Sequence, residues 1–302
     1  MTRRSTSNST ETVAGRRRIL VTLGDPAGIG PEVIDQALAS GQIPEDFEFE
    51  VVGESDGAII GKPDLISARA SLTALESAAA RLRNDDDVAA VVTGPVSKSQ
   101  LESAGFRFPG QTEFFAEHAN CEGFAMCLSG ASLTVGLATI HIPLSEVVGQ
   151  LRSEMIVQVG RLLADFAKRR KGAPPRIAVA GLNPHAGENG KFGDEEQRII
   201  QPAIEELNGL GIGEFVGPGV PDAIFRDAAR GEFDAVVAMY HDQGLIPLKL
   251  LDFDNAVNVT LGLPKPRTSP DHGTAFDIAG KGIARPDSMI RAMCVAAELA
   301  RE

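Results

Sequence analysis

The sequence lacks tryptophan, and aromatic residues of every kind are scarce. Its 302 residues include one Tyr and 14 Phe, and aromatic residues make up 5% of the chain. Basic residues are a minority too, with 29 Lys and Arg against 41 Asp and Glu and a formal net charge of −12. Base-stacking platforms and broad basic surfaces are therefore poorly supplied, so we expect neither a nucleic-acid nor a membrane partner. A local basic pocket for a small anion is compatible with this balance.

Cysteine and long hydrophobic runs are also in short supply. The three cysteines, Cys121, Cys127 and Cys294, form no C-x-x-C pair. A small, odd number of thiols favours a reducing, cytoplasmic location over a disulfide-linked scaffold. No apolar run reaches the ~18 residues that a membrane-spanning helix needs. Residues 1–17 contain Arg and Ser but no hydrophobic signal core, so we expect a disordered tail there, with an organellar transit peptide as the alternative.

Several common catalytic motifs are missing as well. The glycines of Gly24–Gly30 (GDPAGIG) have the wrong spacing for the G-x-G-x-x-G loop of a Rossmann fold. The sequence has no G-x-x-x-x-G-K-[ST] phosphate loop, no H-E-x-x-H and no G-x-S-x-G. Rossmann dehydrogenases, P-loop NTPases, zincins and α/β-hydrolases are thereby disfavoured.

What the sequence does contain is an alternation of short apolar runs with longer helical patterns, over a length that suits two domains or one large domain. The clearest helix is predicted over Ser153–Arg170, and Lys171–Pro175 is predicted to end it and to mark a crossing between domains. The predicted strands are Arg18–Thr22, Phe49–Gly53, Val88–Thr93, Phe124–Leu128, Leu133–Thr139, Arg176–Ala180, Asp234–Met239 and Ala256–Thr260. Such alternation is typical of an α/β fold with a largely parallel sheet.

Polar and Gly-rich clusters follow several of these strands, where α/β proteins place their ligands. We interpret them as loops: Gly24–Gly30, Thr93–Lys98 (TGPVSK), His141–Ser145 (HIPLS), Asn183–Gly193 (NPHAGENGKFG) and Tyr240–Gly244 (YHDQG). Three of the five histidines, His141, His185 and His241, come directly after predicted strands. One such histidine is ordinarily structural, whereas three imidazoles at one sheet edge can also hold a divalent metal. Spacing alone leaves both interpretations open.

Basic side chains are scarce in these loops, which makes Lys98, Lys249 and Arg267 notable. Lys249 and Arg267 flank one segment close to the Tyr240–Gly244 loop. Their charges suit a carboxylate or phosphate, so we favour an anion site over solvated surface charges. Further on, Asp277 lies in a Gly-rich turn, where it can either accept from a ribose diol or simply be part of a turn that opens a helix.

Six segments together resemble one enzyme family, the 4-hydroxythreonine-4-phosphate dehydrogenases. They are GDPAGIGPE at 24–32, TGPVSK at 93–98, FPGQTEFFAE at 108–117, GLNPHAGENGKFGDEE at 181–196, AMYHDQGLIPLK at 238–249 and NVTLGLPKPRTSPDHGTAFDIAG at 258–280. The resemblance runs from about Leu20 to Arg301, and the final stretch is also similar to the cofactor segment of isocitrate and isopropylmalate dehydrogenases. It implies an isocitrate/isopropylmalate dehydrogenase-like α/β fold over residues 18–302, with two intertwined α/β/α subdomains, the active-site cleft between them, and crossings near residues 140–175 and toward the C-terminus.

The resemblance also implies an activity: NAD-dependent, divalent-metal-dependent oxidation of 4-phosphooxy-L-threonine at C3, then decarboxylation to 3-amino-2-oxopropyl phosphate, on the route to pyridoxal phosphate. The implied metal ligands are His141, His185 and His241. The implied substrate contacts are Gln111, Thr112, Lys249, Asn258 and Arg267. The family forms homodimers in which both chains supply metal histidines. The metal itself stays open among Zn, Co, Mn, Mg and Ni.

One further candidate residue and three departures from the family pattern complete the sequence analysis. Asp242, beside a metal histidine, is a candidate for orienting that ring or relaying a proton, with a helix-capping role as the alternative. Gln111 replaces the family's usual histidine, the loop after Gly187 reads ENGKFG, and the region between Gly53 and Ser71 is short. Because of Gln111, a related dehydrogenase of 4-phospho-D-threonate or 4-phosphoerythronate is the first alternative. A phosphate acyltransferase, which shares the fold type, is a remote one.

Overall fold

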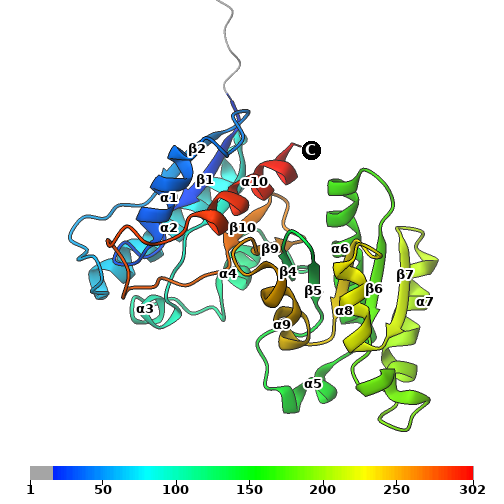
Figure 1. The fold of residues 1–302 in the computed structure, drawn as a ribbon. Helices are drawn as coiled ribbons and strands as arrows, with labels where there is room; N and C mark the ends of the chain where they lie inside the picture. Colours follow the sequence, from blue (N-terminus) through cyan, green and yellow to red (C-terminus); the bar gives the residue numbers. More distant parts are fainter. Residues whose placement is uncertain (1–15, 302) are drawn as a thin grey trace, which may run out of the picture.

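The computed structural model describes residues 16–301 as one mixed sheet with helices packed on it. Most of the predicted N-terminal tail lies outside these residues. Figure 1 shows the sheet running across the whole molecule, in the order β2-β1-β3-β10-β9-β4-β5-β8-β6-β7. The strands are β1 Arg18–Thr22, β2 Glu48–Val52, β3 Val88–Thr93, β4 Ala125–Ser129, β5 Thr134–Leu137, β6 Arg176–Ala180, β7 Glu214–Gly219, β8 Ala235–Ala238, β9 Val257–Leu261 and β10 Arg267–Pro270.

The helices connect these strands and cover both ends of the sheet (Figure 1). They are α1 Gly30–Ala39, α2 Leu65–Asn84, α3 Lys98–Ser103, α4 Gln111–His118, α5 Leu144–Gln150, α6 Ser153–Lys171, α7 Gln201–Gly209, α8 Pro221–Ala229, α9 His241–Asp252 and α10 Asp287–Ala300. A short 3₁₀ turn, η1, spans Pro184–Glu188, and a π turn, η2, spans Glu196–Ile200.

The α/β class predicted from the sequence is confirmed, whereas the largely parallel sheet holds only at the two ends. Strands β2, β1, β3 and β10 run parallel, and so do β5, β8, β6 and β7. In the middle, β9 is antiparallel to both β10 and β4, and β4 is antiparallel to β5. The β4–β5 and β9–β10 connections are too short for the crossover that a parallel pair requires.

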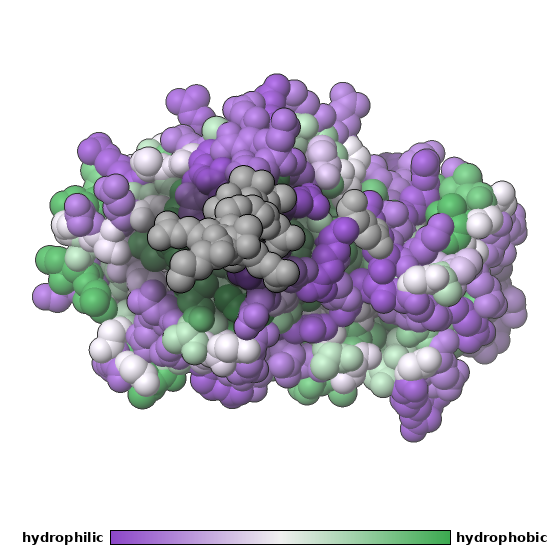
Figure 2. All heavy atoms as spheres, turned by 90° about the horizontal axis from the view of Figure 1, so that it is seen from above, coloured by the Kyte–Doolittle hydropathy of each residue, from purple (hydrophilic) through white to green (hydrophobic). Residues whose placement is uncertain are grey.

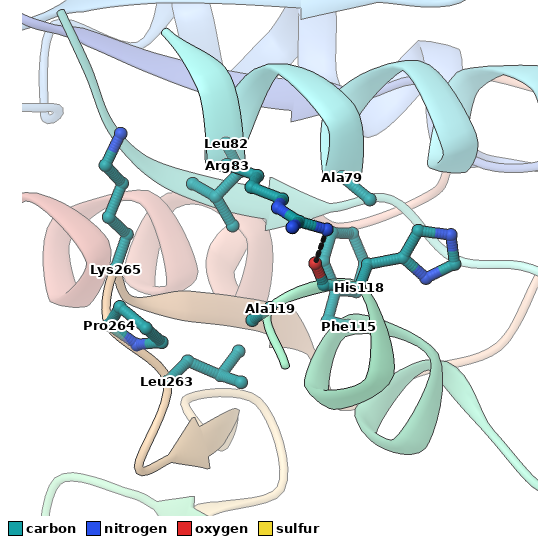
Figure 3. A pocket seen from close by; sticks show the side chains of 9 residues that line it. All are labelled: Ala79, Leu82, Arg83, Phe115, His118, Ala119, Leu263, Pro264 and Lys265. Atoms are coloured by element: carbon teal, nitrogen blue, oxygen red, sulfur yellow. Dashed lines mark hydrogen bonds between the residues drawn. The ribbon is translucent and has the colours of Figure 1, made fainter. Parts of the chain in front are cut away.

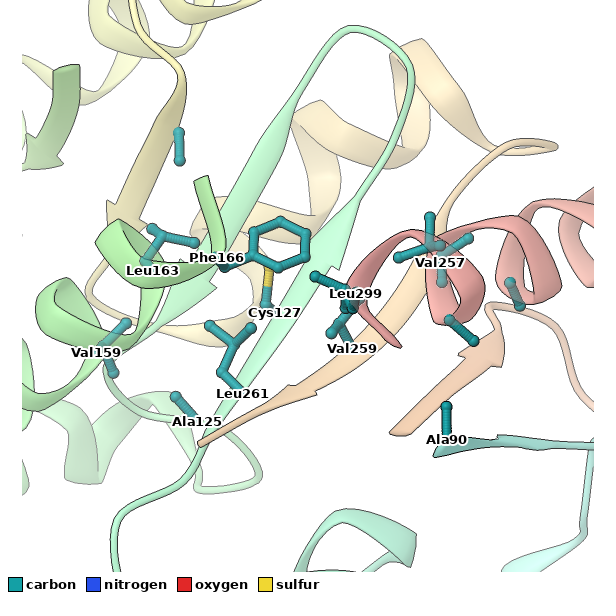
Figure 4. Close-up of a cluster of buried hydrophobic side chains, with 14 of the residues drawn as sticks. Ala90, Ala125, Cys127, Val159, Leu163, Phe166, Val257, Val259, Leu261 and Leu299 are labelled. Atoms are coloured by element: carbon teal, nitrogen blue, oxygen red, sulfur yellow. The ribbon is translucent and has the colours of Figure 1, made fainter. Parts of the chain in front are cut away.

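Helix α6 packs one apolar face on the centre of the sheet. It begins at the predicted Ser153 and ends at Lys171, where Gly172 takes the left-handed conformation (φ 71°) that stops many helices. Figure 4 shows Phe166 and Leu163 beside Cys127 of β4 and Leu261 of β9. The helix stop predicted at Lys171–Pro175 is confirmed, and the division into subdomains that cross near residues 140–175 stays a prediction.

The loop predicted over Tyr240–Gly244 is wrong, because α9 begins at His241. Gly244 lies inside this helix for a packing reason rather than at a turn. A Cβ atom there would stand 2.5 Å from Val135 Cγ1 and 3.1 Å from the Ala238 Cβ. The glycine therefore lets α9 approach β5 and β8 closely, which brings the first turn of the helix to the sheet edge.

Polar side chains predominate on the face of the molecule that Figure 2 shows. The net charge of −12 leads one to expect this. Across residues 16–301, no helix is both long enough and apolar enough to span a bilayer.

Candidate active site

A buried arginine in the middle of the sheet is the first element of the site. Arg267 of β10 is 2% exposed, and its Nη2 donates to Thr93 Oγ1 (2.6 Å) and to Gln111 Oε1 (3.1 Å). Its Nη1 donates to Thr260 Oγ1 (3.3 Å), while its Nε is buried without a hydrogen-bond partner. Burial lowers the pKa of this guanidinium to about 10. No salt bridge joins Arg267 to a carboxylate of residues 16–301, so the position suits a bound anion.

Two more of the predicted substrate residues lie beside this arginine. Thr112 is buried in the first turn of α4, with its Oγ1 3.3 Å from Thr260 Oγ1. Asn258 lies two residues before Thr260 on β9, so both side chains project from the same face of the sheet. The Asn258 Oδ1 atom is buried without a hydrogen-bond partner. Together with Arg267, these groups offer donors and acceptors along one face of β9 and β10.

Lys249 of α9 is held by an aspartate that the sequence analysis did not single out. Its Nζ lies 3.1 Å from Oδ2 of Asp271, the residue that directly follows β10. That oxygen has no well-oriented hydrogen bond, so the contact is an ion pair only. Burial raises the pKa of Asp271, and the charges of Lys249, His272 and His241 partly oppose this rise. The only sequence signal for Asp271 was its place in the segment at 258–280.

Two of the three predicted metal ligands lie side by side. His141 follows β5 and His241 follows β8, the neighbouring parallel strand, and their ring centroids are 5.7 Å apart. Burial is the main cause that lowers the pKa of His141, which favours its neutral form. The Asp242 Oδ1 atom lies 2.7 Å from His241 Nδ1, a contact that fixes the ring and leaves Nε2 available. The orienting role of Asp242 stays a prediction, and this contact is the geometry that such a role requires.

Glu113 connects the histidine pair electrostatically to the buried arginine. This residue of α4 has a buried Oε2 atom without a hydrogen-bond partner. Its charge raises the pKa of both His141 and Arg267, opposing the larger effect of burial on each. A single carboxylate therefore lies within interaction range of both groups. Glu113 stood inside the FPGQTEFFAE segment, but nothing in its spacing indicated a role.

The third predicted metal ligand, His185, lies at the same sheet edge but is not grouped with the other two. It follows β6, which neighbours β8, and its ring faces Phe192 with the centroids 6.0 Å apart. Within residues 16–301, no three His, Cys, Asp or Glu side chains are grouped closely enough to hold a metal ion. The predicted convergence of the three loops is thus only partly met within one chain.

The loop that carries His185 has an uncommon backbone. His185, Ala186, Glu188 and Asn189 all have φ between 40° and 58°, a region that non-glycine residues seldom occupy. The buried Glu196 supports the segment before it, since its Oε1 accepts from the backbone N–H groups of residues 182 and 183 at 2.8 and 2.7 Å. Strain of this kind is concentrated at functional sites.

Asp277 is an exposed residue of the loop that leads to α10. Its carboxylate forms no hydrogen bond or ion pair with the part of the chain that the structure describes. The same loop packs against Gly24–Gly30, since the Ile29 N–H donates to Thr274 O at 2.9 Å. A Cβ at Gly28 would stand 2.7 Å from that oxygen, so the two glycine-rich segments meet backbone to backbone.

The mixed sheet and this site define an α/β protein of the isocitrate dehydrogenase fold type. Isocitrate dehydrogenase from Methylococcus capsulatus shares the fold, with a TM-score of 0.51 at 17% identity over 93% of this chain and 84% of that one. A 4-hydroxythreonine-4-phosphate dehydrogenase from Klebsiella pneumoniae is more similar, with a TM-score of 0.78 at 37% identity over 94% of this chain and 99% of that one.

Residues 16–296 match the family model described as pyridoxal phosphate biosynthetic protein PdxA, and the chain belongs to this family. A 4-hydroxythreonine-4-phosphate dehydrogenase from Erythrobacter litoralis is 44% identical over 94% of this chain and 97% of the relative. A D-threonate 4-phosphate dehydrogenase from Pectobacterium atrosepticum is 39% identical over 93% of this chain and 99% of that relative. The suspected family is thus confirmed.

Proposed function

We propose that this protein oxidises 4-phosphooxy-L-threonine at C3 with NAD and a divalent metal, and that decarboxylation then gives 3-amino-2-oxopropyl phosphate. The observation that carries this proposal is the buried Arg267, which is held by neutral side chains and linked through the charge of Glu113 to His141 of the histidine pair. The chain is also related over its length to 4-hydroxythreonine-4-phosphate dehydrogenases. The substrate has two anionic groups, a phosphate and a carboxylate. The site has two cations, Arg267 and Lys249, to receive them.

Each substrate-site residue has a distinct task in this proposal. Arg267 offers a planar fork of donors to one anionic group, with Thr93 and Gln111 fixing its plane. Lys249 attracts the second anionic group, and Asp271 holds the Lys249 ammonium in place. Asn258 and Thr112 complete the hydrogen bonds around the substrate. Orientation of this kind lowers the entropic part of the barrier.

The histidine pair suits one divalent ion. His141 is held toward its neutral, ligating form, and His241 has the carboxylate partner that metal-bound histidines usually have. We propose His141 and His241 as ligands from one chain and His185 as the ligand supplied by a second copy. When bound, such an ion (Zn, Co, Mn, Mg or Ni) supplies a Lewis acid that lowers the pKa of a substrate hydroxyl.

NAD is the proposed hydride acceptor, and the glycine-rich loop at 271–283 is its proposed site. The unpaired, exposed carboxylate of Asp277 suits the ribose hydroxyls of the adenosine half. Its charge would repel a 2′-phosphate, so NAD should exceed NADP clearly in kcat/KM. Equal use of the two cofactors by the purified enzyme would contradict this role of Asp277.

A homodimer is supported by the surface around the histidine pair. Helices α5 and α9 and the residue after α9 expose large apolar side chains there: Leu144, Val148, Ile246, Leu250, Leu251 and Phe253 are each at least 50% exposed. A concentration of this kind marks an interface more often than a free surface.

We also propose a cytoplasmic location. The three unpaired cysteines support it.

The experiment is an NADH absorbance assay with each candidate metal and three substrates. These are 4-phosphooxy-L-threonine, 4-phospho-D-threonate and 4-phosphoerythronate. We expect 4-phosphooxy-L-threonine to give the highest kcat/KM, and removal of the metal with a chelator to abolish turnover reversibly. Absence of NADH from all three substrates, with every metal, would contradict the proposal.

The second candidate substrate is 4-phospho-D-threonate. The relative from Pectobacterium atrosepticum supports it, because its identity to this chain is close to that of the other relatives. The same assay separates the two, and 4-phosphoerythronate is its third arm. Acyl transfer is tested separately, by release of phosphate from an acyl phosphate that depends on an added thiol as acyl acceptor.

A further inference from the structure

A cavity lies beside the C-terminal half of α4, and none of its lining residues belongs to the histidine pair. It has a volume of about 120 Å³ and lies between α2, α4 and the connection from β9 to β10. Figure 3 shows side chains from these three segments around one space, with Leu82, Phe115 and Leu263 among its apolar walls. An engineered cavity of about 150 Å³ in another protein binds benzene, so this space is on the scale of one small ring.

Besides His118, two cations line this largely apolar space, the exposed Arg83 and the half-buried Lys265, and neither has a carboxylate partner. The Arg83 Nη1 atom forms one long hydrogen bond, 3.5 Å, to the His118 carbonyl oxygen. The Lys265 Nζ atom donates to the Asp85 carbonyl oxygen at 2.8 Å. Neither forms a salt bridge with any acid of residues 16–301. By contrast, Arg81, on α2 like Arg83, pairs with Glu50, and its Nη1 lies 2.7 Å from Glu50 Oε1. In a chain with 41 acidic and 29 basic residues, this is a local excess of positive charge.

We propose that this cavity binds a small molecule with one flat apolar ring and one anionic group, a phosphate or a carboxylate. The ring lies against Leu82 and Phe115, and the anionic group lies between Arg83 and Lys265. The volume limits the ring to a single one, the walls exclude a purely polar ion, and the two cations select for negative charge.

Helix α4, which lines the cavity, also carries residues of the proposed substrate site. A ligand in the cavity can therefore affect substrate binding. The Phe115 ring centroid is 6.0 Å from the Arg267 guanidinium carbon. Gln111 and Thr112 form the first turn of α4, and the connection that carries Lys265 leads directly into Arg267. A ligand in the cavity therefore contacts both segments that hold the substrate residues. We expect it to change the KM for substrate more than kcat, a consequence that rests on the proposed function.

Binding is measured by calorimetry on the full chain, with phenyl phosphate and benzoate as probes. Benzyl alcohol tests the need for charge, and inorganic phosphate tests the need for the ring. Arg83→Gln and Lys265→Gln should each weaken binding of phenyl phosphate by about fivefold or more. The control is Arg69→Gln, an exposed arginine of α2 outside the cavity, which should leave the affinity unchanged.

Three outcomes would overturn the site. The first is equal affinity for phenyl phosphate and for benzyl alcohol or inorganic phosphate, and the second is no heat of binding at millimolar probe. Binding that survives Arg83→Gln and is lost in Lys249→Gln would place the probe in the substrate site and also reject the proposal. Ala79→Leu, which fills the cavity, is a second blocking variant. Its folding is checked by thermal melting, and Arg83→Gln carries the test if it fails to fold.

Coupling is tested separately, in the NADH assay at increasing phenyl phosphate. We expect a KM change of at least twofold that disappears in Arg83→Gln and persists in Arg69→Gln. An unchanged KM while calorimetry reports binding would overturn the coupling. Because calorimetry needs no turnover, a chain that is inactive on all three substrates would contradict the proposed function without affecting the binding result.

Discussion

Arg267 is the residue on which the substrate site depends most. Its guanidinium is almost fully buried, and its partners are two threonine hydroxyls and one amide rather than a carboxylate. Burial of a charge without a counter-charge is costly, and a bound anion offsets that cost. We therefore expect the side chain to contribute to the recognition of an anionic substrate rather than to the stability of the ligand-free fold.

We expect Arg267→Lys to raise the KM for 4-phosphooxy-L-threonine by about tenfold or more, roughly 1.4 kcal/mol. Lysine keeps the charge but cannot reproduce the fork that contacts Thr93 and Gln111 on one nitrogen and Thr260 on the other. Steady-state kinetics measure the effect, with the exposed Arg230→Lys as control. A KM within twofold of the original would show that the fork is not used.

Gln111 bears on the identity of the substrate. Its Oε1 accepts from Arg267 Nη2 at 3.1 Å, so the side chain positions the guanidinium and cannot titrate. We expect Gln111→His to change KM by less than about tenfold, roughly 1.4 kcal/mol, and to leave kcat similar. A several-hundredfold rise in kcat on 4-phosphooxy-L-threonine would indicate that another compound is the natural substrate.

At the scale of elements, one carboxylate ties together the first strands and the longest helix. Glu50 of β2 pairs with Arg81 of α2 through both oxygens, at 2.7 Å each, and with Arg18 of β1 at 2.8 Å. The Arg81 guanidinium is the largest cause that lowers the pKa of Glu50, followed by the opposing effect of burial. The network fastens the edge of the sheet to the helix that covers it.

Glu50→Gln should lower the free energy of unfolding at pH 7 by about 1 kcal/mol, since the pair is partly exposed to solvent. A lowered folded-state pKa means that this contribution is fully present above the unfolded pKa of about 4.3 and is lost as pH falls through the folded value. The variant should therefore lose less stability than the original protein between pH 5 and 3. Urea unfolding at several pH values measures this, with Glu48→Gln in the same strand as control.

The sequence predicted elements well where one physical cause dominates. Helix α6 was found because its apolar face is regular and Gly172 ends it. Strand β10 was missed because its sequence, RTSP, is polar and is buried by neighbours distant in the chain. Strand β7 contains two glycines and a proline, which read as a turn. The start of α9 was missed because Gly244 indicates a loop unless its close contact with β5 is known.

The candidate site was predictable to a similar degree. The resemblance located Gln111, Thr112 and Arg267, and the structure brings these three together. Glu113 and Asp271 could not be found in this way, because their roles arise from burial and from charges on other elements. Residue spacing carries no information about such three-dimensional effects.

For the whole molecule, the proposed shared site makes a test by mixed dimers possible. His141 and Arg267 both interact with Glu113 of their own chain, whereas His185 faces elsewhere. Mixing inactive His185→Ala chains with inactive Arg267→Ala chains should restore about a quarter of the activity, because half the dimers then hold one intact site of two.

A mixture of His141→Ala with Arg267→Ala is the matched control. It should stay inactive, because one site of the mixed dimer then lacks His141 and the other lacks Arg267. Light scattering confirms that each variant is dimeric. Equal recovery in both mixtures, or recovery in neither, would contradict the proposed division of the ligands between chains.

The position of β10 in the sheet determines when the N-terminal strands can complete their pairing during translation. Strand β10 lies between β3 and β9, and its Arg267 pairs with Val91 of β3. The ribosome makes β1, β2 and β3 early, but the free edge of β3 has no partner until residue 270 has emerged. An unpaired edge of apolar residues is a template for aggregation. A chain cut short before β10 is therefore expected to aggregate rather than to fold as an independent N-terminal half.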